Sequence, residues 1–72
     1  MELSNEQKIG IVNGHITELL AEQYSHQLRI IEFDAAGVEN INSEMYQQMV
    51  DMVAQYDLRI AALQAEKDRL SE

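Results

Sequence analysis

The sequence predicts an all-α protein, two long antiparallel helices that form a coiled-coil helical hairpin. Three observations carry this prediction: the 72 residues include no proline, uncharged residues recur at alternating spacings of three and four in both halves of the chain, and Gly37 interrupts this pattern at mid-chain. We expect one helical-hairpin domain over residues 1–72, with helices at about 5–36 and 42–70 and a turn at 37–41. A connection this short makes consecutive helices antiparallel neighbours.

Both ends of the first helix carry capping signals. Ser4 is a favoured N-cap residue, and Gln7 three residues later completes a capping box. At the other end Gly37 tolerates the left-handed conformation that ends many helices, and Val38 follows where a Schellman motif places an apolar residue against Phe33.

The second helix has a clear start and a favourable end. Asn42 is the expected N-cap, with Asn40 as a competing choice, and Ile41 and Tyr46 occupy the two positions of a hydrophobic staple. Lys67 and Arg69 lie in the last turns, where the helix dipole favours cations.

One stripe of each helix has the spacing of a coiled-coil seam, and we call these the inner stripes. The inner stripe of the first helix consists of Ile9, Val12, Ile16, Leu19, Gln23, His26, Ile30 and Phe33. The inner stripe of the second consists of Tyr46, Met49, Val53, Tyr56, Ile60, Leu63, Lys67 and Leu70. Pairing the stripes from the turn outward places Phe33 near Tyr46 and Ile16 near Leu63.

The first helix carries a second uncharged stripe on its far side, which we call the outer stripe. It consists of Gly10, Gly14, Thr17, Ala21, Tyr24, Leu28, Ile31 and Ala35. A surface helix needs only one apolar face, so this stripe predicts a second helical neighbour. Gly10 and Gly14 would permit a close helix–helix contact; the alternative is that they are tolerated in frayed first turns.

Oligomerisation is the expected way to cover the outer stripe, because a chain this small has few other means of gaining stability. We expect a homo-oligomer, a four-helix or larger bundle. Outward residues of the second helix offer one possible mate for the outer stripe: Ala54, Leu58, Ala61, Ala62 and Ala65.

Polar residues interrupt the inner stripe of the first helix at Gln23 and His26. A buried polar group needs a partner, and Tyr56 on the second helix is placed to bond either residue. We interpret Gln23, His26 and Tyr56 as a polar layer that fixes the register of the hairpin. The alternative is a pH-sensitive switch at His26.

Composition excludes several function classes. Thirteen acidic against five basic residues give a net charge of −8, which disfavours direct binding to nucleic acid or to anionic membranes. The chain has no cysteine and no apolar run near the roughly 20 residues of a membrane span. His15, Glu18, Glu22 and His26 follow one another at helical spacing along one flank, but the span from His15 to His26 is about 16 Å, too long for one ion. We therefore expect no enzyme activity, no metal site and no cofactor.

The chain resembles the short coiled-coil hairpin accessory proteins of tailed bacteriophages over most of its length. The resemblance lies in the opening Leu3-Ser4-Asn5-Glu6-Gln7-Lys8-Ile9, in the break at Gly37, and in the run Arg59-Ile60-Ala61-Ala62-Leu63-Gln64-Ala65-Glu66. It implies a viral accessory protein, a virion component or a small host-directed effector, in the host cytoplasm or in the virion. It assigns no functional residue.

Two functions remain open from the sequence. The first is a structural or protein-interaction module that self-associates, or docks on a larger assembly, through the outer stripe. The second is an inhibitor or adaptor whose acidic surface competes for a basic site on a partner protein. The acids available for it are Glu18, Glu22, Glu32, Asp34, Glu39, Asp51 and Asp57.

Overall fold

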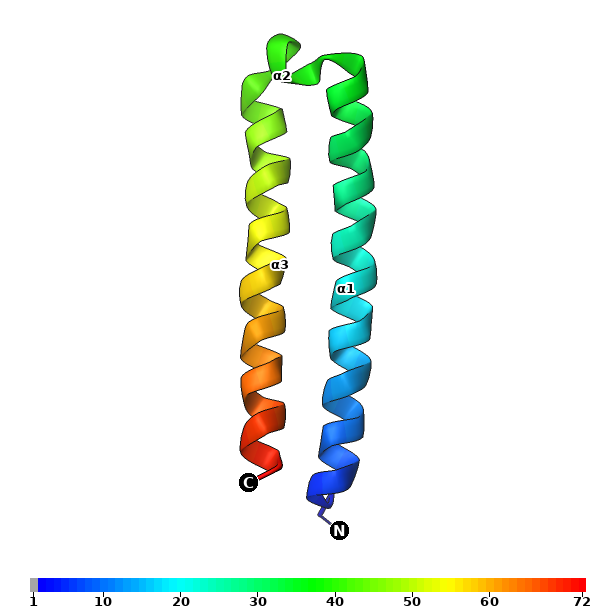
Figure 1. Ribbon diagram of the computed structural model, residues 1–72, viewed down its shortest axis with the longest axis vertical. Helices are drawn as coiled ribbons and strands as arrows, with labels where there is room; N and C mark the ends of the chain where they lie inside the picture. The colour runs from blue at the N-terminus through cyan, green and yellow to red at the C-terminus, as the bar shows by residue number, and fades with distance from the viewer. Residues whose placement is uncertain (1) are drawn as a thin grey trace.

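Two long helices lie side by side in a computed structural model that describes residues 2–72. Helix α1 spans Asn5–Ala36, the single-turn helix α2 spans Val38–Ile41, and α3 spans Ser43–Leu70. Helices α1 and α3 run antiparallel and pack against each other, with α2 at the tip that joins them (Figure 1). The resulting rod measures 54 × 18 × 15 Å, and residues 2–72 form no strand. The all-α fold with two long packed helices is therefore confirmed.

The caps of α1 form as the sequence predicts. The Gln7 amide donates to the Ser4 hydroxyl at 3.1 Å, and the Ser4 amide donates to Gln7 Oε1 at 2.8 Å, which completes the capping box. Gly37 adopts the left-handed conformation at φ 72°, and its amide donates to the Asp34 carbonyl at 3.2 Å. A side chain at Gly37 would strain this conformation, so glycine is required where α1 ends.

The connection between the long helices differs from the expected turn, because residues 38–41 form a helical turn of their own. The amides of Asn40 and Ile41 both donate to the Gly37 carbonyl, which starts α2 directly after the left-handed residue. Asn40 is thereby inside α2, and Asn42 caps α3 by accepting from the Met45 amide at 3.1 Å. The expected staple is wrong: Ile41 ends α2 and is 80% exposed, so it is not packed against Tyr46.

The inner stripes face each other along the whole hairpin. Every residue of both inner stripes is buried or half-buried. The most buried apolar side chains are Leu19, Ile60 and Leu70. Two helices enclose only a narrow apolar seam between them, so most side chains of the hairpin remain exposed to solvent.

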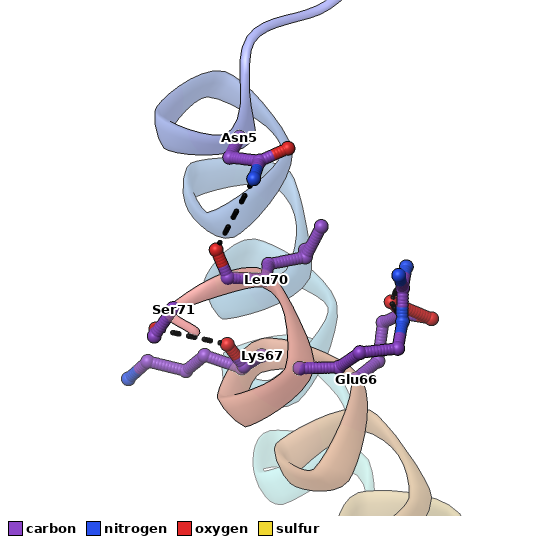
Figure 2. Close-up of polar contacts among 6 residues, drawn as sticks. Asn5, Glu66, Lys67, Leu70 and Ser71 are labelled. Carbon is purple, nitrogen blue, oxygen red and sulfur yellow. Dashed lines mark hydrogen bonds and ion pairs between the residues drawn. The ribbon is translucent and has the colours of Figure 1, made fainter.

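Polar contacts tie α1 to α3 near both ends. At the open end, the Asn5 side-chain amide donates to the Leu70 carbonyl at 3.3 Å, while the Ser71 hydroxyl caps α3 itself by donating to the Lys67 carbonyl at 3.0 Å (Figure 2). Near the tip, the Tyr46 hydroxyl donates to Asp34 at 2.6 Å. The carbonyl of Leu70 is free to accept because the last carbonyls of a helix have no partner within the helix.

Candidate interaction surfaces

The outer stripe of α1 is solvent-exposed along its entire length. Its three large side chains, Tyr24, Leu28 and Ile31, are 60%, 41% and 61% exposed. Leu20 lies beside them and is also exposed. Large apolar side chains that gather on one uncharged helix face, rather than scatter singly over the surface, are typical of a binding surface.

The hairpin gives no packing reason for Gly10 and Gly14. A Cβ atom added at either position would meet nothing within 4 Å. Both lie well inside α1, where glycine costs about 1 kcal/mol relative to alanine. The space above both glycines is therefore open to a second molecule.

Charged residues of α1 gather on a flank between the two stripes. His15, Glu18 and Glu22 line a shallow groove there, which Arg59 borders from α3. Within residues 2–72 no group of three or more His, Cys, Asp or Glu side chains has an arrangement that could hold a metal ion. Acidic and basic side chains therefore meet in this groove. The outer stripe itself contains no charged residue.

Helix α3 presents a smaller apolar patch to solvent. Leu58 is 72% exposed, and its alanine neighbours are exposed as well: Ala54, Ala61, Ala62 and Ala65. This patch offers one large side chain, whereas the outer stripe of α1 offers three.

Gln23 is buried in the seam and is fully engaged with α3. Its Nε2 atom donates to the Val53 carbonyl at 3.1 Å and to Asp57 Oδ1 at 2.7 Å. Within residues 2–72 no buried side-chain nitrogen or oxygen lacks a hydrogen-bond partner. The stripe pattern predicted Tyr56 as the partner of Gln23 and did not identify Asp57. The signal for Asp57 was its position one residue from Tyr56, at the edge of the inner stripe.

His26 and Tyr56 form the second half of the polar layer. The Tyr56 hydroxyl lies 3.5 Å from His26 Nε2, and the ring centroids are 5.5 Å apart at an interplanar angle of 37°. The Arg59 guanidinium lies 5.1 Å from the Tyr56 ring centroid, within the range of a cation–π contact. The three residues of the expected polar layer are therefore brought to one level of the hairpin, and Gln23 uses different partners from His26.

Tyr46 and Asp34 form a hydrogen bond near the tip of the hairpin. The hydrogen bond to Asp34 raises the pKa of the Tyr46 phenol above its ordinary value. Loss of solvent around the hydroxyl and the negative charges of Asp34 and Glu39 act in the same direction. This contact is exposed and lies near the tip, so it is a structural contact of the hairpin.

Comparison with protein-family models, with curated proteins and with solved structures found no match to this chain. None of the helices in residues 2–72 combines the length and the apolar character that a membrane crossing requires.

Proposed function

We propose that this chain is a non-enzymatic protein-interaction module that self-associates, or docks on a larger assembly, through the outer stripe of α1. The observation that carries the proposal is the exposure of Tyr24, Leu28 and Ile31 in a stripe whose own residues are all uncharged. The four-helix or larger bundle expected from the sequence is the oligomer that this proposal implies.

The narrow seam supports the same proposal. A domain of this size buries a smaller fraction of its surface than a larger one does, and it commonly needs a partner, a metal or a disulfide. Cysteine is absent from the chain. A second molecule on the outer stripe would add apolar burial worth roughly 25 cal/mol per Å².

The experiment compares the wild-type chain with Leu28→Glu by sedimentation velocity at micromolar concentration. We expect the wild-type chain to sediment as a dimer or larger species and Leu28→Glu as a monomer, because the variant places a charge in the contact. Ile41→Glu is the matched control, since it adds the same charge at an exposed apolar residue outside the outer stripe. Equal self-association of wild type and Leu28→Glu would contradict the proposal.

The acidic surface favours a second candidate function, competition for a basic site on a partner protein. The acids that the sequence singles out, Glu18 and Asp51 among them, are all exposed, and the net charge is −8. The two functions respond oppositely to salt. Salt weakens attraction to a basic partner, whereas it strengthens contact between two chains that are both acidic, because it screens their repulsion.

The resemblance to phage accessory proteins stays a prediction, as does location in the host cytoplasm or in a virion. Under this proposal the larger assembly would be a phage particle or a host complex. Self-association of the purified chain does not depend on which of these it joins.

A further inference from the structure

The outer stripe changes character along α1. Its N-terminal half holds the small residues Gly10, Gly14, Thr17 and Ala21, and its C-terminal half holds the large residues Tyr24, Leu28 and Ile31 before it ends at Ala35. Open space lies above the two glycines, and the large side chains project into solvent. One half of the stripe is therefore a shallow depression and the other half a ridge.

This gradient of size is complementary to itself when one copy is reversed. We propose that two copies of the chain pair antiparallel through α1, with the two-fold axis at Ala21, so that the large half of each outer stripe fills the small half of the other. This register rests on the proposed function, and it names the partner as a second copy of the chain.

The antiparallel register pairs three small residues with three large ones. Gly10 lies opposite Ile31 of the second copy, Gly14 opposite its Leu28, and Thr17 opposite its Tyr24, while Ala21 faces its own counterpart. The residue numbers of each pair add to 41 or 42, so all the pairs fit one register within the 1.5 Å rise of a residue. The interface is isologous, as a two-fold axis requires.

A parallel pair would not match in this way. Tyr24 would meet Tyr24 and Leu28 would meet Leu28, while the glycine ends would face each other across a gap. Dispersion contacts are lost across such a gap, and the opposed large side chains would hold the helices apart. Size complementarity therefore selects the antiparallel arrangement.

The charge of the chain limits where a second copy can bind. Two chains of net charge −8 repel each other, and the residues of the outer stripe include no acid. The paired residues from Gly10 to Ile31 span about 32 Å of α1, so a strip about 10 Å wide has an area on the order of 300 Å² on each copy. The pair then buries about 600 Å² in total, which is the size of a weak interface.

Complementary charges test the register in solution. The variants Gly14→Arg and Leu28→Glu are each expected to raise the dissociation constant at least about tenfold, because each puts a charge opposite an apolar or small residue. In a one-to-one mixture the arginine introduced at position 14 faces the glutamate introduced at position 28, and the other half of the interface keeps its native pairs. We expect the mixture to form a heterodimer, measured by sedimentation velocity with one variant carrying a fluorescent label.

A mixture of Gly14→Arg with Glu22→Arg is the control. Position 22 lies on the charged flank of α1, outside the outer stripe that contains position 28. This control mixture contains no glutamate at position 28, so the arginine at position 14 has no opposite charge to face and the two variants should not form a heterodimer. Circular dichroism checks that each variant keeps its helix content.

The outcomes separate this register from the proposed function. A wild-type chain that stays monomeric contradicts both. A wild-type dimer whose two charge variants dissociate and do not recombine contradicts the register alone, and it indicates that the outer stripe packs on α3 of the second copy or in a parallel pair. Recombination of Gly14→Arg with Leu28→Glu supports the antiparallel register.

Discussion

The two stripes of α1 have the same spacing, and neither contains Asp, Glu, Lys or Arg, yet only one of them is buried. The inner stripe packs on α3 and is buried or half-buried throughout, whereas every residue of the outer stripe is exposed. Their compositions do not explain this difference, because the inner stripe holds Gln23 and His26 while the outer stripe holds Leu28 and Ile31. Burial follows from the presence of a partner helix, and this chain supplies one such helix for two stripes.

The largest expected effect separates the seam from the exposed surface by truncation of a leucine in each. Leu19→Ala should lower the free energy of unfolding by about 2–3 kcal/mol, because it leaves a cavity in the seam. Leu58→Ala, at an exposed position on α3, should change it by less than about 0.5 kcal/mol. Urea unfolding followed by circular dichroism at high dilution measures both. Equal losses would mean that the seam contributes no more to stability than the surface does.

The next effect concerns the polar layer within the inner stripe. Gln23→Ala removes the hydrogen bonds to Val53 and Asp57 and should lower the free energy of unfolding by about 1–3 kcal/mol. Gln27→Ala, on the exposed surface one turn later, is the control and should be nearly neutral. If Gln23→Ala and Gln27→Ala have the same free energy of unfolding, then the hydrogen bonds of Gln23 in the seam do not stabilise the hairpin.

A smaller effect distinguishes the glycines of the outer stripe from the glycine of the turn. Gly14→Ala should raise the stability of the monomer by about 1 kcal/mol, because alanine is the better helix former and its Cβ meets nothing within 4 Å. Gly37→Ala should lower stability by a similar amount, about 1 kcal/mol, because Gly37 has a positive φ. Thermal melts at high dilution compare them, and a loss of stability in Gly14→Ala would place that site in contact within the hairpin.

The smallest effect is a dependence on pH at the tip. Since the pKa of Tyr46 is raised in the folded chain, its contribution is fully present below the ordinary tyrosine pKa of about 10 and is lost as the pH rises through the folded value. The melting temperature of the wild-type chain should therefore approach, or fall below, that of Tyr46→Phe between pH 8 and pH 11. A constant difference between the two would exclude a role for the hydrogen bond to Asp34.

Local signals predicted much of the fold. Ser4 with Gln7, and Gly37, mark the ends of α1 because capping depends on residues a few positions apart. The spacing of the inner stripes identified which residues face the seam, because both helices keep one period without a break. These features need no knowledge of how the chain is arranged in space.

Contacts set by three-dimensional detail were not predictable in the same way. Asp57 accepts from Gln23 at 2.7 Å, whereas the spacing of the stripes pointed to Tyr56, because spacing alone does not show which side chain at the edge of the seam reaches across it. The helical turn of α2 arises from two amides that share the Gly37 carbonyl, and this turn leaves Ile41 in solvent. Under our proposal the outer stripe is covered by another molecule, and the fold of one chain does not contain that contact.

The concentration dependence of the melting temperature tests the central claim most directly, because a partner that binds only the folded chain stabilises it by mass action. If the outer stripe of α1 is covered by association, the melting temperature of the wild-type chain rises over a hundredfold increase in concentration, and that of Leu28→Glu does not. A wild-type chain that melts cooperatively at one temperature across this range, and sediments as a monomer throughout, would contradict the claim that the stripe needs a cover.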